Sequence, residues 1–70
     1  MIVYDRLWET MRNKGVTQYS LIHDYNINEA QLDRFRKNTV IKTSTIDRIC
    51  EILDCNVEDI CQYVRNTSEK

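Results

Sequence analysis

Residues 17–38 read TQYSLIHDYNINEAQLDRFRKN, and this stretch decides the fold. Thr17 stands where a helix would begin, because its hydroxyl can accept a backbone N–H of the first turn. The helix that it caps would run over residues 18–24. Asn26 then supplies a residue that tolerates the left-handed backbone in which a helix can end sharply. The first half of the stretch therefore predicts a short helix followed by a tight turn.

A second helix is predicted directly after that turn. Asn28 and Gln31 have the spacing of a capping box, in which two side chains bond the backbone N–H groups of a helix start. Leu32 and Phe35 then fall on one face, and apart from Ala30 the remaining side chains are polar. We expect this helix over residues 29–37. Two short helices joined by a tight turn, the second polar outside, are typical of a helix-turn-helix that places its second helix in the DNA major groove.

A helix is also expected before this pair. Apolar residues at steps of three and four describe one helix face over residues 4–14, and Gly15 suits the end of such a helix. The apolar residues of this first segment are Val3, Tyr4, Leu7, Trp8 and Met11.

Two more helices are expected after the pair. Ser44 and Asp47 form a second capping box, with Thr43 as a rival cap, and open a fourth helix. Asn56 and Asp59 form a third box and open a fifth helix. The inward residues of this fifth helix would be Val57, Ile60, Cys61 and Val64. Nothing alternates with period two for long enough to predict a sheet.

The size and composition narrow the remaining possibilities. The chain of 70 residues allows one domain. We expect a compact all-α bundle of five helices over residues 1–65 and a frayed tail at residues 66–70. No apolar run approaches the ~20 residues that a membrane helix needs, and no signal peptide is evident, so the chain is expected to be cytoplasmic. Three cysteines, an odd number, then indicate reduced thiols rather than a disulfide framework.

Charge is unevenly distributed along the chain. The net charge is −1, which by itself does not favour nucleic acid. Residues 34–48, however, hold five basic residues against Asp47 alone, whereas residues 49–70 hold five acidic and two basic residues. The basic stretch overlaps the end of the predicted groove helix and the loop after it, where a DNA-binding surface needs positive charge.

The order and spacing of these signals resembles the Cro and phage-repressor type of helix-turn-helix regulator, also called the xenobiotic-response-element type. The resemblance covers roughly residues 4–64. It rests on Thr17-Gln18-x-x-Leu21, Asn26-Ile27-Asn28, Leu32 and Phe35, Ser44-Thr45-Ile46-Asp47-x-Ile49-Cys50-x-x-Leu53, and Val57-x-Asp59-Ile60. It implies a lambda-repressor-like five-helix fold and a bacterial or phage transcription regulator. Such a regulator would bind double-stranded DNA as a homodimer, with the fifth helix, Trp8 and Tyr63 as candidates for the dimer surface.

The resemblance also implies a set of DNA-contacting residues. Gln18 would meet a phosphate or brace the groove helix, residues 28–31 would face base edges, and Arg34 would reach a base or a phosphate. The basic and polar residues that follow Arg34 would hold phosphates. The chemistry agrees, because arginine reads guanine, glutamine suits adenine and a carboxylate such as that of Glu29 can accept from cytosine. The complete set is Thr17, Gln18, Asn28, Glu29, Ala30, Gln31, Arg34, Lys37, Asn38, Lys42 and Thr43.

Two other classes of function are weighed against DNA binding. A protein-interaction module on the same fold, such as an antitoxin, an antirepressor or a partner-binding subunit, is favoured by the net charge and by Glu29 and Asp33 on the groove helix. An enzyme is not expected, because the sequence offers no paired carboxylates, no phosphate-binding loop, no metal motif and no nucleophile constellation. The spacings of Cys50, Cys55 and Cys61 do not follow the paired pattern of common zinc sites. Neither a metal nor a cofactor is therefore expected.

Overall fold

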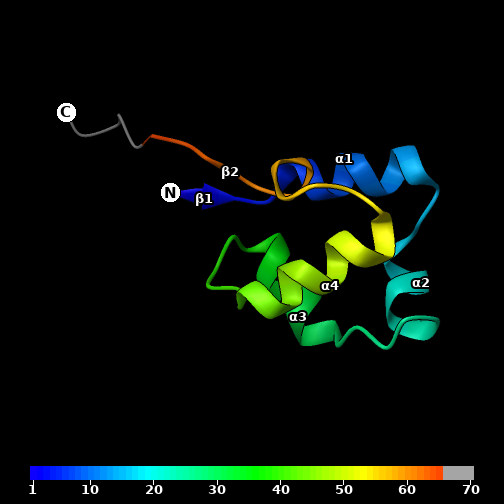
Figure 1. Ribbon diagram of the computed structural model, residues 1–70. Helices are drawn as coiled ribbons and strands as arrows, with labels where there is room; N and C mark the ends of the chain where they lie inside the picture. Colours follow the sequence, from blue (N-terminus) through cyan, green and yellow to red (C-terminus); the bar gives the residue numbers. More distant parts are fainter. Residues whose placement is uncertain (66–70) are drawn as a thin grey trace.

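The computed structural model describes residues 1–65, and the frayed tail predicted at residues 66–70 lies outside them. The described chain is mostly helical, with one small two-stranded sheet (Figure 1). In chain order the elements are β1 (Ile2–Val3), α1 (Asp5–Lys14), α2 (Gln18–His23), α3 (Glu29–Arg36), α4 (Thr43–Leu53), the 3-10 turn η1 (Val57–Asp59) and β2 (Gln62–Tyr63). No helix among these residues is long and apolar enough to cross a membrane.

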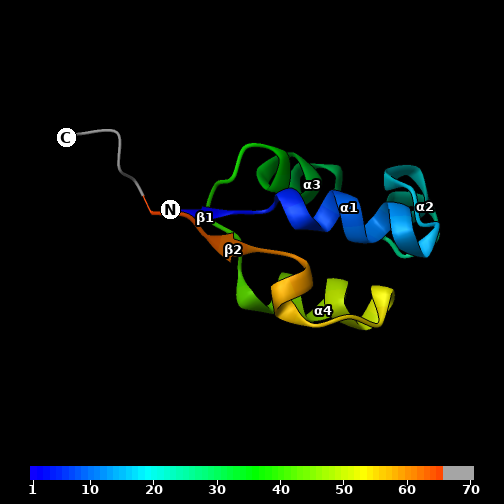
Figure 2. The same ribbon diagram turned by 90° about the horizontal axis from the view of Figure 1, so that it is seen from above.

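Helix α1 rests on the pair formed by α3 and α4. In Figure 1 it lies above both helices, and from above, in Figure 2, it runs between them. The sheet lies at one end of the molecule and α2 at the other in both views. Helix α2 and the joined ends of the described chain therefore lie at opposite ends of the molecule, whereas the end of α3 lies close to β1.

The helix boundaries in the first half of the chain follow local sequence signals. Helix α1 ends at Gly15, whose φ of 72° is left-handed. Helix α2 begins after Thr17, whose Oγ1 accepts a hydrogen bond from the Ser20 N–H at 3.0 Å. Asn26 has a φ of 59° in the turn between α2 and α3. The predicted roles of Gly15 and Thr17 and the left-handed backbone of Asn26 are confirmed, although α2 already ends at His23, with Asp24 as its C-cap.

The capping box predicted at the start of α3 forms only in part. Asn28 caps the helix, because its Oδ1 accepts the Ala30 N–H at 2.7 Å. Gln31 does not reach back to Asn28, and its Nε2 instead donates to Thr45 Oγ1 of α4 at 3.3 Å. Thr45 is buried, and a buried hydroxyl needs a partner. The contact between helices thus replaces the local one.

The capping box predicted from Ser44 and Asp47 is wrong. Helix α4 begins at Thr43, with Lys42 as its N-cap, and no side chain caps it. The backbone carbonyl of Lys42 accepts the Thr45 N–H at 3.0 Å, so the first turn is closed before Ser44 could act as a cap. Thr43 therefore lies inside the helix start, next to the true N-cap.

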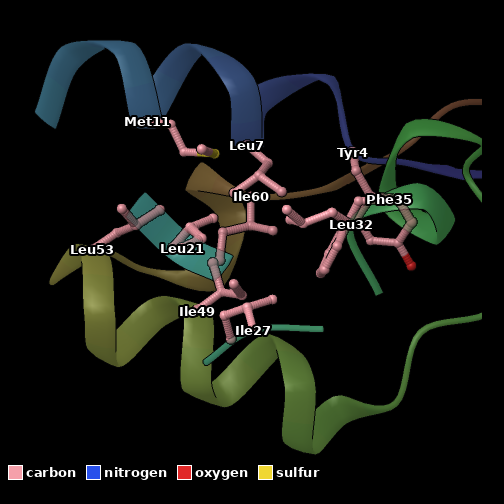
Figure 3. Packing of buried hydrophobic residues seen from close by; sticks show 10 residues of the cluster. All are labelled: Tyr4, Leu7, Met11, Leu21, Ile27, Leu32, Phe35, Ile49, Leu53 and Ile60. Atoms are coloured by element: carbon pink, nitrogen blue, oxygen red, sulfur yellow. The ribbon is translucent and has the colours of Figure 1, made fainter. Parts of the chain in front are cut away.

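The core draws side chains from all four α-helices, from the residue before α1, from the turn between α2 and α3, and from the residue after η1 (Figure 3). Tyr4 and Phe35 meet edge to face, with ring centroids 5.0 Å apart and planes at 86°, the arrangement that aromatic quadrupoles favour. Burial on this scale is the main stabilising contribution in a chain this small. The buried cluster consists of Tyr4, Leu7, Met11, Leu21, Ile27, Leu32, Phe35, Ile49, Leu53 and Ile60.

The predicted fifth helix is wrong, and residues 1–65 form four α-helices. The box of Asn56 and Asp59 does form, but it opens only the single 3-10 turn η1. Ile60 is fully buried, whereas Val57 and Val64, which a helix would have turned inward, are 53% and 43% exposed. Ile60 packs into the core, and the residues that follow it form a strand instead of a helix.

That segment forms β2, which pairs antiparallel with β1. Val3 is opposite Gln62, and Met1 and Val64 exchange hydrogen bonds of 2.9 Å and 2.7 Å beyond the strand ends. The expectation of an all-helical chain without a sheet is therefore corrected. The sequence pattern could not reveal this sheet. Met1 and Val64, which bond each other beside the strands, are 63 positions apart, and strands of two residues show no alternation of polar and apolar side chains.

Candidate nucleic-acid interface

The turn between α2 and α3 is anchored to the core on both sides. Leu21 of α2 is fully buried, and its carbonyl accepts the Ile27 N–H at 2.9 Å. Ile27 is also buried, as are Leu32 and Phe35 on the inner face of α3. The opposite face of α3 is left to solvent on a firm support, as a helix that enters a groove requires.

Gln18 and Arg36 join the outer surfaces of the two helices. The Oε1 atom of Gln18 accepts hydrogen bonds from Nε and Nη2 of Arg36 at 3.1 Å and 2.5 Å. The guanidinium uses its planar fork of donors on a single acceptor. Of the two roles predicted for Gln18, the structure contains the bracing of α3.

The N-terminal end of α3, which Asn28 caps, is exposed to solvent. Asn28, Glu29 and Ala30 are all exposed, and Thr17 is exposed at the start of α2. The Oδ1 atom of Asn28 is engaged by its capping bond, which leaves its amide nitrogen as the donor for a partner. Gln31 is half-buried and turned towards Thr45, so its amide lies at the edge of this surface.

Arg34 and Lys42 are brought together across a small recess. The recess has a volume of about 70 Å³ and is lined by Gln31, Arg34, Ile41, Lys42 and Thr45. Arg34 and Lys42 are exposed. Among residues 1–65, neither side chain makes a hydrogen bond or ion pair. Two free cations therefore lie beside the exposed face of α3, with Lys42 at the positive end of α4.

Comparison with known proteins identifies this arrangement. Residues 6–66 match the sequence pattern of the Cro/C1-type HTH DNA-binding domain. The chain belongs to this family. The match includes all but the first residue of α1, the helix-turn-helix pair, α4 and β2, and the resemblance inferred from the sequence is confirmed. No curated protein matches the chain significantly.

A solved structure shares the fold of this Cro/C1-type domain. It is a crystal structure of the transcriptional regulator VanUg, with a TM-score of 0.82 and 20% sequence identity. The alignment covers 93% of this chain and 87% of the other. At this identity the likeness concerns the fold, which is therefore one that a transcriptional regulator uses.

Acidic side chains engage part of the positive charge on α3 of this Cro/C1-type domain. Asp33 Oδ2 lies 2.9 Å from Lys37 Nζ, and Asp33 Oδ1 lies 3.5 Å from Arg36 Nη1. Glu29 Oε2 lies 3.6 Å from Arg36 Nη2. The hydrogen bond from Lys37 is the main cause that lowers the pKa of Asp33 below its usual value, with the charges of Lys37 and Arg36 adding to it. Lys37, predicted to hold phosphate, is thus paired within the helix.

Asn38 has a structural position in the Cro/C1-type domain. Its φ is 54°, and its Oδ1 accepts the Tyr4 N–H at 2.9 Å, which ties the end of α3 to the start of α1. The side-chain oxygen is therefore engaged, which leaves the amide nitrogen as the possible phosphate donor. Thr43 is exposed at the first turn of α4, beside Lys42.

Arg36 belongs to this surface but is absent from the set of DNA-contacting residues predicted from the sequence. It contacts Gln18, Glu29 and Asp33 and is the centre of the polar network on α3. The spacing of three between Asp33 and Arg36 is a helical signal that could have indicated part of this network. The contact with Gln18 could not be found in that way, because it depends on the angle between two helices.

Proposed function

We propose that this Cro/C1-type domain is a sequence-specific transcriptional regulator that lays α3 in the major groove of double-stranded DNA. The observation that carries the proposal is the free pair of cations, Arg34 and Lys42, beside the exposed and capped start of α3. A groove helix needs residues that reach bases at its start and cations that hold the flanking phosphates. This surface offers both on a support braced by Gln18 and Arg36.

The roles of the individual residues follow from their chemistry and position. Glu29, Ala30 and the amide of Asn28 meet base edges, because they project from the first turn of α3. Arg34, one turn further, is long enough to reach a guanine or a phosphate. Lys42 binds a phosphate, assisted by the backbone N–H groups at the start of α4.

A salt titration of DNA binding tests this function. The logarithm of the affinity for a random duplex should fall linearly with the logarithm of the salt concentration. A double variant with Arg34→Ala and Lys42→Ala should flatten that line by a slope of about 2. The control is Arg12→Ala, which removes an exposed positive charge from α1 and should leave the slope unchanged. Absence of binding by the folded wild type at low salt would refute the proposal.

Selection of bound sequences from a random pool tests specificity. An enriched sequence of defined length supports base readout by α3. Retention of every sequence equally, with a steep salt dependence, would leave only phosphate binding and would contradict the sequence-specific part of the proposal.

The proposal includes a homodimer on DNA, with half-sites about one helical turn, roughly 34 Å, apart. A single module makes a small interface, and two half-sites supply the specific affinity that it lacks.

The surface for this dimer differs from the one expected from the sequence. The fifth helix suggested for the dimer surface does not form, and Trp8 is half-buried against the core. Tyr63 is 67% exposed and opposite Ile2 in the sheet. Ile2 and Val40 line a neighbouring hollow of about 510 Å³, so we assign this apolar surface to a second copy.

Sedimentation equilibrium tests the assigned dimer surface. Tyr63→Ser should weaken self-association, whereas Tyr19→Ser, which removes an equally exposed ring from α2, should not. Equal dimerisation of both variants would place the interface elsewhere, and a monomer at every concentration, with and without duplex DNA, would refute the homodimer.

A second function is favoured by the acidic residues of α3. Asp33 and Glu29 engage Lys37 and Arg36, and this lowers the positive charge that α3 offers to phosphates. The alternative is a protein-interaction module on the same fold, with α3 as the contact surface. It predicts a folded protein that fails to bind any duplex at low salt.

A further inference from the structure

We propose that Asp33 limits sequence-independent DNA binding, because its carboxylate pairs with Lys37 and Arg36 in the place that a DNA phosphate would take. The inference rests on the proposed function, because it concerns the same DNA-binding surface. It assigns a carboxylate on the groove helix a role that needs no contact with a base.

The geometry of the pairs supports this role. Asp33 and Lys37 are one helical turn apart, and their side chains meet at 2.9 Å, the distance of a charge-assisted hydrogen bond. The second carboxylate oxygen lies 3.5 Å from Arg36. One carboxylate therefore contacts two cations, and no buried environment forces the arrangement, since the Asp33 side chain is 44% exposed. A phosphate would offer Lys37 the same kind of partner.

The other contacts of Arg36 make Lys37 the cation that Asp33 controls. Arg36 also bonds Gln18 and approaches Glu29, so the loss of Asp33 would leave it held in place. Lys37 has no other ionic or hydrogen-bonded side-chain partner among residues 1–65. Removing the charge of Asp33 therefore releases one lysine to the surface, at the C-terminal end of α3.

The consequence for DNA follows from charge. Sequence-independent affinity comes from cations that replace the counterions of phosphates. In the wild type, Arg34 and Lys42 are free to do so, whereas Lys37 must first leave Asp33, which itself repels the phosphates. The pair thus keeps the affinity for unrelated DNA below the value that the number of basic residues on α3 would allow.

The test is the salt dependence of binding to a random duplex, measured for the wild type and Asp33→Asn. The variant should bind about tenfold more tightly near 0.1 M salt, with a salt slope steeper by about 1, because one further phosphate contact forms. The matched control is Asp54→Asn. Asp54 lies at the other end of α4 in a left-handed conformation that asparagine tolerates, so this variant makes the same change in net charge without freeing Lys37.

Variants of Lys37 complete the test. Lys37→Ala should change the random-duplex affinity of the wild type little, but it should abolish the gain in the Asp33→Asn background. An equal gain in Asp33→Asn and Asp54→Asn, or a gain that persists without Lys37, would overturn the inference, since overall charge would then explain it. A loss of affinity in Asp33→Asn would overturn it too and would indicate a direct contact between Asp33 and a base. Absence of binding by every variant would refute the DNA-binding function itself.

Discussion

The side-chain oxygen of Gln18 accepts two hydrogen bonds from the guanidinium of Arg36, at 3.1 Å and 2.5 Å. This contact is the polar link between the outer faces of α2 and α3, and it adds to the apolar packing beneath. Gln18→Ala should lower the free energy of unfolding by about 1 kcal/mol, since hydrogen bonds to charged groups contribute more than neutral ones but exposure weakens them. Urea denaturation followed by circular dichroism measures the change.

Gln18→Glu separates bracing from phosphate contact. Glutamate keeps the acceptor for Arg36 and adds an ionic attraction, so the stability should equal or exceed that of the wild type. The affinity for DNA should nevertheless fall, because a negative charge then lies beside α3, the helix proposed to enter the groove. Equal stability of Gln18→Ala and the wild type would show that the bracing contact contributes nothing in solution.

Asn38 combines a left-handed backbone with a hydrogen bond to the Tyr4 N–H. Asn38→Ala should lower the free energy of unfolding by about 2 kcal/mol, because it loses the acceptor and introduces a residue that disfavours positive φ. Asn38→Gly loses the same acceptor but accepts the backbone, so its loss should be smaller by about 1 kcal/mol. Identical losses in the two variants would show that the backbone conformation does not contribute to the difference.

Features that depend on neighbouring residues were predictable from the sequence. The left-handed end of α1 at Gly15, the cap of α2 at Thr17 and the left-handed Asn26 each depend on one residue and its nearest turn. The buried faces of α3 and α4 also follow from apolar residues at helical spacing. These signals sufficed for the helix-turn-helix, and hence for the resemblance to the family.

Features that join distant segments were not predictable in this way. The residues after Ile60 are predicted to be helical from their capping box and apolar spacing, yet they pair with β1 at the start of the chain. Gln31 is predicted to complete the cap of α3 but bonds Thr45 of α4. In both cases a tertiary partner competes with the local one, and the sequence pattern shows only the local one. The hydrogen bond between Asn38 and the Tyr4 N–H spans 34 positions, so no local signal indicates it.

Arg34 and Lys42 should affect DNA binding differently, although both line one recess. Lys42→Ala should weaken binding to every duplex alike and reduce the salt slope by about 1, as expected for a phosphate contact. Arg34→Ala should also reduce the salt slope on unrelated DNA by about 1, and in addition it should relax the preference at one base pair, with a loss of about 1–3 kcal/mol for the preferred base. Titration against the selected sequence and its single-base variants measures both. If Arg34→Ala weakened all sequences equally, Arg34 would contact phosphate alone.

Cys55 should react slowly with alkylating reagents in the folded protein. Its thiol is half-buried after the left-handed end of α4, where its N–H donates to the Cys50 carbonyl at 3.1 Å. Burial, followed by the charges of Cys50 and Asp59, raises the pKa of the Cys55 thiol from 9.0 to about 11. Only the thiolate is nucleophilic, and each unit by which the pKa rises reduces the thiolate fraction at pH 8 about tenfold. Alkylation of Cys55 at pH 8 should therefore be about one hundredfold slower than alkylation of an unperturbed thiol. The rate should keep rising up to about pH 11.

Iodoacetamide labelling, resolved by peptide mass spectrometry, measures this rate at Cys55, with the chain unfolded in urea as the control. Equal rates at Cys55 in the folded and unfolded chains would show that the end of α4 does not protect the thiol.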